Sequence, residues 1–462
     1  MFENISAHYS NISEKAHKSY LNKLEKCLND NLDFHDVRSN YLSHNFHAFP
    51  AKFPPQLPKR FILGLTELDD IVLDPMMGSG TTILEAMFNN RHAIGFDIDP
   101  LALMITTVKT TSYNKKSLID EFNKIVDYSN YLIGSNQSKL LDIYNTFDLE
   151  TKKFIDYWFY KDTIKELLAI SFCVSLIENE KIKIFFRVLF SSIIITKSGG
   201  VSLALDLAHT RPHKAKRIID PYSEQLFSSG EIEFEQKSYL TKKLKNPINE
   251  FKKKFHQNIE SILCEKNNYE PFLKLANSQN LPLSDNSVDL VVTSPPYANN
   301  AIDYMRTHKF SLLWFGFKIE NLKNARKEYI GHDSILNVQI ENVPPYPRKI
   351  ISKIKKKNIK KFQSLHRYFS EMTRVLKEMH RVIKPNRSVI LVVANSNICG
   401  VDSESHICLK EIGESIGFTV PYIGERTIDR DRRMLPASHK ENSESNILNR
   451  MHKEYIIGFY KY

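Results

Sequence analysis

Residues 71–82 read IVLDPMMGSGTT. The first three residues of this stretch form a short apolar run that predicts a buried strand. Gly78 and Gly80 follow in a turn, and the sequence TTILEAMFNN (81–90) then has the pattern of a helix. HAIGFD (92–97) predicts a second strand. The order of strand, glycine turn, helix and strand indicates the start of a βαβ unit with parallel strands.

Glycines between a strand and a helix indicate a ligand site, because they let the backbone approach a ligand and the helix N-terminus offers unpaired N–H groups. Three ligand classes compete. A P-loop needs a Lys after the last glycine and about four residues between glycines, and neither is present. A dinucleotide loop needs a third Gly or Ala at position 83, which is Ile83. A loop for S-adenosylmethionine has no phosphate to neutralise and needs no Lys.

Asp97 ends the second predicted strand and lies 19 residues after Gly78. This is close to the separation at which a carboxylate binds ribose hydroxyls in nucleotide-binding βαβ units. Alternatively, Asp97 or Asp99 caps the helix that begins near Pro100. Asp99 is the better cap, and Asp97 is the better ribose ligand.

A second segment with alternating strands and helices begins near residue 270. An amphipathic helix, which Pro385 is expected to end, separates two of its strands. The predicted strands are 288–293, 388–394, 418–428 and 454–462, and the predicted helices are 366–385 and 407–417. This alternation predicts an α/β fold with a doubly wound, mostly parallel sheet that helices cover on both faces.

Residues 111–265 have a different texture, rich in Lys, Phe and Ile with helical periodicity. We expect four units: an N-terminal helical extension (1–39), an α/β domain in two parts (40–110 and 266–462), a helical insertion (111–265), and a basic insertion (318–362) within the second part. The apolar run 183–196 carries Arg187 and is too short to span a bilayer, so it predicts a buried helix or strand and no membrane contact.

The sequence TSPPYANN (293–300) follows the predicted buried strand 288–293. Ligands of open parallel sheets bind beyond the carboxyl ends of the strands, so this turn is expected to face the same site as the glycine loop. Its prolines have no backbone N–H and cannot donate a hydrogen bond, which leaves the carbonyls of Ser294 and Pro295 as acceptors. Tyr297 adds a flat ring. Acceptors beside a ring suit a planar amino compound, such as the exocyclic amine of a nucleobase.

A second Pro-Pro-Tyr occurs at residues 344–346. It follows NVQIEN (337–342), which is not a buried strand, and precedes Pro347 and a lysine run. This context predicts an extended linker with a structural role. The functional prediction for residues 294–297 therefore depends on the buried strand that precedes them, rather than on the Pro-Pro-Tyr sequence itself.

Together, DPMMGSGTT (74–82) and TSPPY (293–297) resemble the motifs of the DNA amino-methyltransferases that modify cytosine N4 or adenine N6. HAFPAKFPPQLPKRFI (47–62) resembles the motif before the first strand of that family. Residues 366–396 resemble the helix and strand after its catalytic turn, and RRMLP (432–436) resembles part of its C-terminal hairpin region.

The resemblance implies a seven-stranded Rossmann-like methyltransferase sheet that uses S-adenosylmethionine. The residues it assigns to cofactor binding are Phe49, Asp74, Gly78, Ser79, Gly80, Thr81, Asp97 and Asn277, and those it assigns to catalysis are Ser294, Pro295, Pro296 and Tyr297. The family often has an acidic residue where this chain has Asn277, whose side-chain oxygen still accepts from an adenine amine.

Ser in the first position of the turn resembles the cytosine-N4 subgroup, whereas Asp or Asn is commoner in adenine-N6 enzymes. The resemblance thus favours a site-specific cytosine-N4 methyltransferase acting on duplex DNA, as the protective enzyme of a restriction-modification system. Its endonuclease partner would act on the same site without a stable complex. The alternatives are adenine N6, another substrate such as RNA or a protein glutamine, and a catalytically silent DNA-binding module.

Lys and Arg outnumber Asp and Glu by 64 to 53, giving a net charge of +11, which favours a polyanionic partner. The candidate contacts to DNA are Arg211, Lys214, Lys216, Arg217, Arg306, His308, Lys353, Lys355, Lys356, Lys357, Lys360, Lys361, Arg432 and Arg433. Phe310, Leu313 and Trp314, from the same stretch as Arg306 and His308, are expected in the core.

The five cysteines have no CxxC pair and no metal-ligand spacing, which predicts reduced thiols and no metal in a cytosolic protein. The resemblance to restriction-modification enzymes implies a bacterial or archaeal cytosol. Methylation of cytosine carbon 5 needs a Cys nucleophile, and none of the five follows a proline or ends a convincing buried strand before a catalytic turn.

Overall fold

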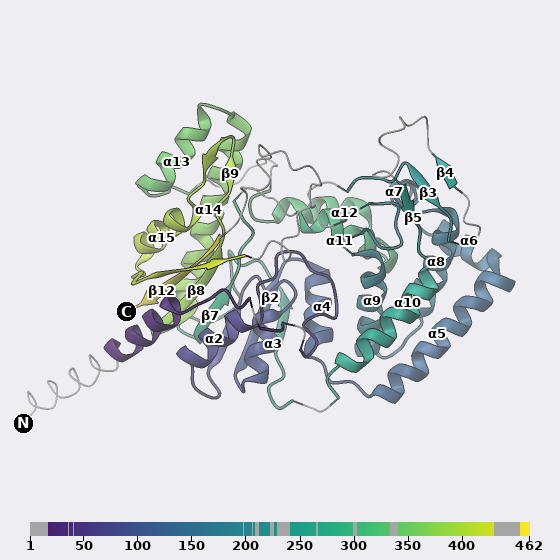
Figure 1. Cartoon of the computed structure of the whole chain (residues 1–462), viewed down its shortest axis with the longest axis horizontal. Coiled ribbons are helices and arrows are strands. Elements are labelled where there is room, and N and C mark those ends of the chain that lie inside the picture. The colour runs from purple at the N-terminus through teal and green to yellow at the C-terminus, as the bar shows by residue number, and fades with distance from the viewer. Residues whose placement is uncertain are drawn as a thin grey trace, which may run out of the picture.

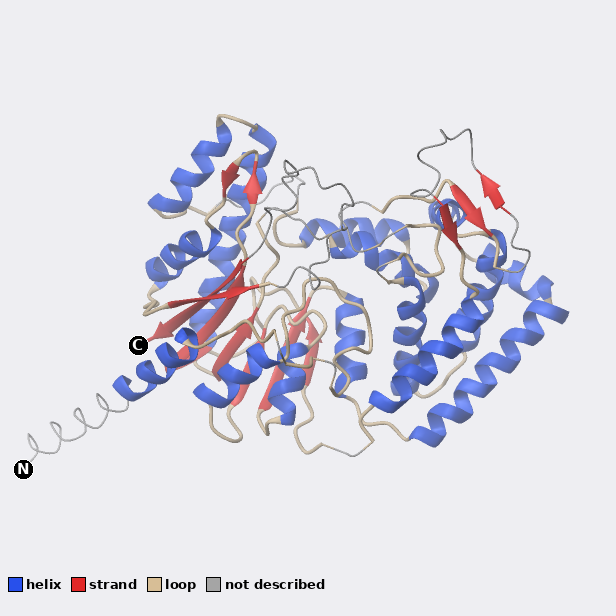
Figure 2. Ribbon diagram, viewed as in Figure 1, coloured by secondary structure: helices blue, strands red, loops and turns tan. Residues whose placement is uncertain are grey.

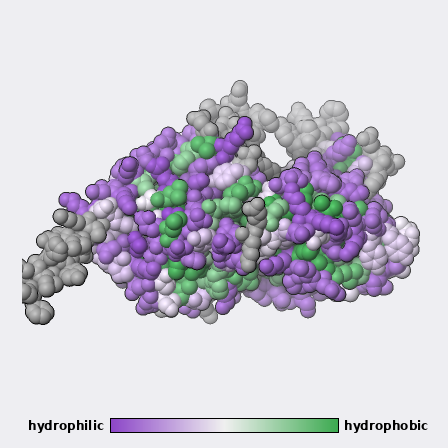
Figure 3. Space-filling view, turned by 90° about the horizontal axis from the view of Figure 1, so that it is seen from below, coloured by the Kyte–Doolittle hydropathy of each residue, from purple (hydrophilic) through white to green (hydrophobic). Residues whose placement is uncertain are grey.

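The structure, a computed structural model, describes most of the chain. The described residues are 17–35, 37–39, 41–196, 198–205, 207, 212–221, 226–228, 241–264, 267–298, 303–332, 341–428 and 453–462. No helix among them is long and apolar enough to cross a membrane. On the face seen in Figure 3, hydrophobic residues occur in small groups among hydrophilic ones, as on ordinary protein surfaces.

Within the described residues, the main sheet has seven strands in the order β11-β12-β8-β7-β1-β2-β6. Neighbouring strands are parallel except β12, which runs antiparallel to both β8 and β11 (Figure 2). The strands are β1 (Ile71–Asp74), β2 (His92–Asp97), β6 (Phe272–Leu275), β7 (Val288–Thr293), β8 (Ile383–Val393), β11 (Ile423–Thr427) and β12 (Lys453–Lys461). The predicted mostly parallel, seven-stranded sheet is confirmed.

Helices cover both faces of this sheet, as predicted. Successive residues of a strand point to opposite faces. Val72 accordingly packs with one helical layer and Leu73 with the other. The first layer contains the helix of residues 17–29, α2 (Gln56–Leu65) and α3 (Thr81–Phe88), and the second contains α13 (Pro345–Lys355), α14 (Ile359–Val382) and α15 (Ser405–Ile416). Both faces are therefore buried, which explains the continuous apolar runs of β7 and β8.

The segment between β2 and β6 begins with α4 (Pro100–Thr110) and continues into a group of helices that lies beside α4 (Figure 1). These are α5 (Lys115–Ser135), α6 (Gln137–Asn145), α7 (Leu149–Trp158), α8 (Lys161–Ser175), α9 (Glu180–Ile194) and α10 (Pro247–Asn258). A small sheet accompanies them, made of β3 (Arg217–Ile219), β4 (Leu226–Ser228) and β5 (Thr241–Lys243). The apolar run 183–196 lies largely in buried α9.

The core of this helical group is continuous with the α/β domain. It includes Leu101 and Ile105 of α4, and Phe310 of α11 (Tyr304–Leu312), together with Leu313 and Trp314, which were expected in the core. The helix α12 (Ile319–Ala325) packs on the same core. In Figure 1, α12 lies on the side of the helical group, whereas α13 and β9 (Asn397–Ile398), which pairs with β10 (Val401–Asp402), lie on the opposite side above the sheet.

Two local predictions are wrong. The helix before β8 ends at Val382 rather than at Pro385, and Pro385 lies within β8, because a residue before proline disfavours helical backbone angles. Residues 344–346 are not an extended linker. Pro344 occupies the N-cap position of α13, and Pro345 is the first residue of that helix, where a missing N–H costs nothing. The Tyr346 hydroxyl donates to Glu404.

Candidate functional site

The glycine loop links β1 to α3 and adopts backbone angles that require glycine. Gly78 has a φ of 49° and Gly80, the N-cap of α3, a φ of 73°. A Cβ atom at Gly78 would lie 3.0 Å from the Phe49 ring, and one at Gly80 would lie 2.5 Å from the Thr106 methyl group. Side chains at these positions would therefore displace the loop or its neighbours.

Three buried or half-buried side chains hold this loop in place through hydrogen bonds to its backbone. Asp97 accepts a hydrogen bond from the Gly78 N–H through Oδ2 at 2.8 Å, and the Lys109 ammonium donates to the Ser79 carbonyl at 2.7 Å. The Thr106 hydroxyl donates to the Gly78 carbonyl at 3.2 Å. Sequence reasoning missed Lys109, although a lysine on the buried face of a helix such as α4 is itself a signal.

Asp97 and Asp99 have separate roles. Asp99 caps α4 by accepting from the N–H groups of Leu101 and Ala102, which confirms the predicted cap. Asp97 faces the loop and also accepts from the Asp99 N–H at 2.9 Å. Burial, followed by the charge of Asp99, raises the pKa of Asp97 to about 7.

Asp99 also receives two side-chain hydrogen bonds from the segment after the turn of residues 294–297. His308 Nδ1 lies 2.6 Å from Asp99 Oδ2, and the Tyr329 hydroxyl donates to the same oxygen at 2.8 Å. Burial opposes ionisation of Asp99, but the nearby His308 and these hydrogen bonds outweigh it and hold its pKa below the ordinary value. The sequence prediction that His308 faces a base or phosphate is therefore wrong. It is fully buried, because α11 places it on the same face as Met305 and Leu312.

A cavity with an empty volume of about 880 Å³, solvent at its mouth included, opens beside the glycine loop. Predicted cofactor and catalytic residues come together here. Those that line it are Phe49, Asp74, Gly78, Ser79, Thr81, Asp97, Asn277, Ser294 and Pro296, whereas Gly80, Pro295 and Tyr297 do not. None of the described lining residues is a cysteine.

Sequence reasoning missed the aromatic residues that complete this cavity. The Tyr304 ring stacks on Phe49 with centroids 5.3 Å apart, and Tyr329 and the aliphatic Ile330 also line the cavity. Lys52 also lines the cavity and donates to the His44 carbonyl at 2.8 Å. Asn277 Oδ1 accepts from the Gln279 N–H at 3.0 Å, so one of its lone pairs is already used.

The turn of residues 294–297 lies at the carboxyl end of β7, whose six residues are all buried. Ser294 is half-buried, and the Tyr297 hydroxyl donates to Glu454 Oε1 at 2.8 Å. Burial and the Glu454 carboxylate raise the pKa of Tyr297 well above 10. The phenol therefore stays protonated and is a donor rather than a base.

The predicted DNA contacts are scattered over several elements. Lys353, Lys355, Lys356, Lys357 and Lys360 are exposed at the junction of α13 and α14, and Lys361 is half-buried. Arg306 pairs with Asp303 at 3.2 Å, and Lys214 lies 4.2 Å from the centre of the Tyr157 ring. Lys216 is exposed and Arg217 is half-buried in β3. Arg211, Arg432 and Arg433 lie outside the described residues.

Comparisons with known proteins agree with this geometry. A model of the DNA methylase family matches residues 2–107 and 288–461, which is more than half of the chain. The chain is 25% identical over 465 residues to the type II methyltransferase M.MvaI of Kocuria varians, covering 96% of this chain and 97% of that protein. It is also 25% identical over 336 residues to the type II methyltransferase M.BsoBI of Geobacillus stearothermophilus, covering 69% of this chain and 62% of that protein.

A third relative is the type II methyltransferase M.MjaII of Methanocaldococcus jannaschii, 35% identical over 144 residues that cover 28% of this chain and 27% of that protein. The segments matched by the family model contain both the glycine loop and the Ser294–Tyr297 turn, and they leave out most of the helical group. The chain therefore belongs to the DNA methylase family, as a DNA methyltransferase of the restriction-modification type that uses S-adenosylmethionine.

Proposed function

We propose that this protein transfers a methyl group from S-adenosylmethionine to the exocyclic N4 amine of cytosine at a specific site in duplex DNA. The observation that carries this proposal is Ser294, which precedes Pro295, Pro296 and Tyr297 and lines the same cavity as Gly78 and Asp97. Ser at this position resembles the cytosine-N4 subgroup of the family.

The cavity offers S-adenosylmethionine a polar group without a partner and a loop with no side chain in the way. The Ser79 hydroxyl is buried and has no hydrogen-bond partner among the described residues, and the absence of a side chain at Gly78 keeps the loop open toward Phe49. Asp97 would accept the ribose hydroxyls, while Asp74, Gly80 and Thr81 form the loop beside the methionine part. Asn277 would accept from the adenine amine. When bound, this cofactor supplies an electrophilic methyl group on a sulfonium.

The residues of the turn would polarise the target amine. An aromatic amine is a weak nucleophile because its lone pair is delocalised into the ring. The carbonyls of Ser294 and Pro295 would accept its N–H hydrogens and so localise the lone pair toward the methyl group. The protein contributes mainly position, since the turn and the glycine loop border one cavity.

A base inside duplex DNA must leave the stack to reach this cavity, at a cost of roughly a few kcal/mol. The Tyr297 ring would replace part of the lost stacking. Exposed lysines at the α13–α14 junction, with Lys214 and Arg306 on the side of the helical group, would contact phosphates. The 111–265 region would contain the target-recognition surface.

The relatives named above are type II methyltransferases, and this supports a protective role for the present chain beside a restriction endonuclease. The endonuclease would recognise the same DNA site independently, without a stable complex. The intact loop and turn argue against a silent DNA-binding module.

The test is to incubate the protein with methyl-labelled S-adenosylmethionine and duplex DNA, and to digest the product to nucleosides. N4-methylcytosine is the expected product. N6-methyladenine would overturn the choice of base, and label found only in RNA or protein would overturn the choice of substrate. A Gly78→Val variant, in which the added side chain meets the Phe49 ring, serves as the control without transfer.

A further inference from the structure

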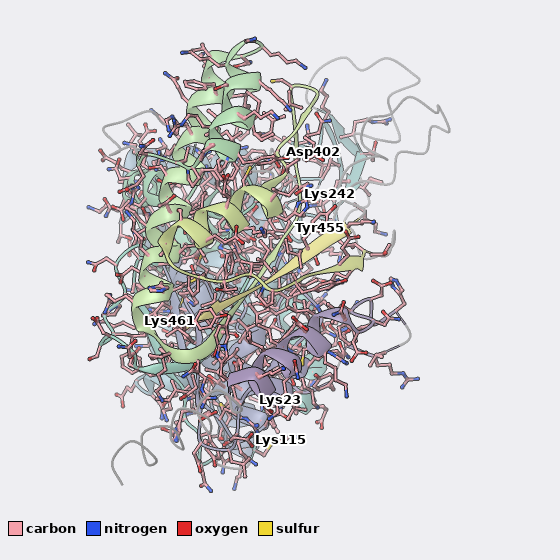
Figure 4. All side chains as sticks on the ribbon, turned by 90° about the vertical axis from the view of Figure 1, so that its left-hand side faces the viewer. Lys23, Lys115, Lys242, Asp402, Tyr455 and Lys461 are labelled. Atoms are coloured by element: carbon pink, nitrogen blue, oxygen red, sulfur yellow. The ribbon has the colours of Figure 1, made fainter. Side chains whose placement is uncertain are left out.

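The catalytic turn is joined to a residue near the C-terminus of the chain. Tyr297 follows β7, and its hydroxyl donates to Glu454 of β12 at 2.8 Å. The two strands are separated by β8 in the sheet. Because β12 runs antiparallel to β8, its first residues lie at the edge where β7 and β8 end, and Tyr455 pairs with Val393. Figure 4 labels Tyr455, next to Glu454, and Lys461 near the two ends of β12.

A second residue, from the neighbouring strand, forms an ion pair with Glu454. Arg426 of β11 is the cross-strand partner of Glu454, so the two side chains lie on the same face of the hairpin. Arg426 Nη1 lies 3.5 Å from Glu454 Oε2, and the side chains are only 5% and 12% exposed. One carboxylate oxygen thus faces Tyr297 and the other faces a buried guanidinium.

A buried carboxylate is expensive to desolvate, and a hydrophobic pair would stabilise a hairpin equally well. Its position beside the catalytic turn therefore calls for a role beyond folding. Packing and rotamer preferences already limit the orientations of a half-buried tyrosine ring, and a hydrogen bond to its hydroxyl narrows them further. The hydrogen bond to Glu454 does this at the ring that the proposed mechanism uses for stacking.

We propose that Glu454 is a positioning residue that orients the Tyr297 ring for the extruded base, and that Arg426 fixes Glu454 for this task. The stacking role rests on the proposed function. The orientation of the ring by Glu454 does not depend on it. The β11–β12 hairpin thereby belongs to the active site as well as to the sheet.

Variants of both partners test the proposal. Glu454→Ala should lower the single-turnover rate of methyl transfer by about 100-fold, as for other misplaced catalytic groups, and leave the KM for the cofactor nearly unchanged. Tyr297→Phe should show a similar loss, and the double variant should lose no more than either one. Glu454→Gln, whose amide oxygen still accepts the hydroxyl, should keep most of the rate. Additive losses would overturn the proposal.

Glu425→Ala is the matched control. Glu425 lies in the same hairpin, pairs with Lys453 at 2.8 Å and is half exposed. Its removal should leave the rate at the wild-type value. If Glu454→Ala behaves like this control, Glu454 has no positioning role.

A spectroscopic measurement reports on the ring without any catalysis. In protein labelled with 3-fluorotyrosine, the ¹⁹F resonance that disappears in Tyr297→Phe identifies Tyr297. It should shift and broaden in Glu454→Ala, stay close to the wild-type position in Glu454→Gln, and stay unchanged in Glu425→Ala. An unchanged resonance in a folded Glu454→Ala protein would overturn the proposal. If this resonance responds but the wild-type protein methylates no DNA, the proposed function fails and the positioning role stands.

Discussion

At the scale of single residues, Asp97 connects the candidate cofactor cavity to the glycine loop that borders it. Its carboxylate accepts from the Gly78 N–H, and it faces the cavity in which a ribose would lie. The same group therefore shapes the loop and would bind the ligand. Asp99, two residues further on, is occupied by the α4 cap, His308 and Tyr329 and does not share this task.

The raised pKa of Asp97, about 7, predicts a pH dependence of cofactor binding. The ligand-free protein carries the neutral acid below this pH and the carboxylate above it. Binding of S-adenosylhomocysteine should strengthen between about pH 6 and about pH 8, because the ionised group is the better acceptor for ribose hydroxyls. The free energy of unfolding of the ligand-free protein should fall as the pH rises from about 3.8 to about 7 and then level off, since only between these two pKa values does the folded state bind this proton more than the unfolded chain does.

Isothermal titration calorimetry across this pH range checks the prediction. Asp97→Asn should bind weakly at every pH, whereas Asp285→Asn, an exposed residue paired with Arg381, should follow the wild-type curve. A flat wild-type curve would contradict the assignment of Asp97.

At the scale of elements, α4 connects the glycine loop to the helical group. Its buried Lys109 donates to the Ser79 carbonyl, and burial lowers the pKa of this lysine well below its usual value. Leu101, Ile105 and Val108 of α4 pack on the core that contains α9. Movement of the helical group would therefore be transmitted to the glycine loop through α4.

Lys109→Met tests this connection, because the substitution keeps the volume and removes the donor. The loss of one buried hydrogen bond should weaken S-adenosylhomocysteine binding by about 10-fold, since such a loss costs about 1 to 2 kcal/mol. DNA affinity should stay at the wild-type value. Lys116→Met, at an exposed site of α5, is the control. Equal cofactor affinities in the two variants would show that Lys109 does not support the loop.

The α13–α14 junction carries the second element-scale prediction. Replacing Lys355 and Lys356 together by Ala should weaken DNA binding and lower the slope of log affinity against log salt by about 0.9 for each phosphate that the variant no longer neutralises. Fluorescence anisotropy at several salt concentrations measures this slope. The control pair is Lys23 and Lys115. Figure 4 shows both at the end of the molecule far from Asp402 of β10, which lies on the same side of the molecule as α13. An unchanged slope would place the phosphate-binding residues elsewhere.

At the scale of the whole molecule, the parts of the fold that depend on short stretches of sequence were predictable. The alternation of strands and helices predicted the sheet, and the glycine loop and Ser294 turn met at one cavity because parallel strands end at one edge. The partners of His308, Lys109 and Glu454 were not predictable. Each partner is at least 30 residues away along the chain, and a helix or strand pattern does not say which buried polar groups will meet.

The central claim is that the glycine loop and the Ser294–Tyr297 turn form one DNA methyltransferase site for cytosine N4. Single-base mapping of modified bases in the genome of a methylation-free bacterial host that expresses the protein tests it most directly. We predict N4-methylcytosine at one defined sequence, and its loss when Tyr297→Ala is expressed at the same level. Modified adenine at that sequence, an unmodified genome, or an unchanged pattern with Tyr297→Ala would contradict the claim.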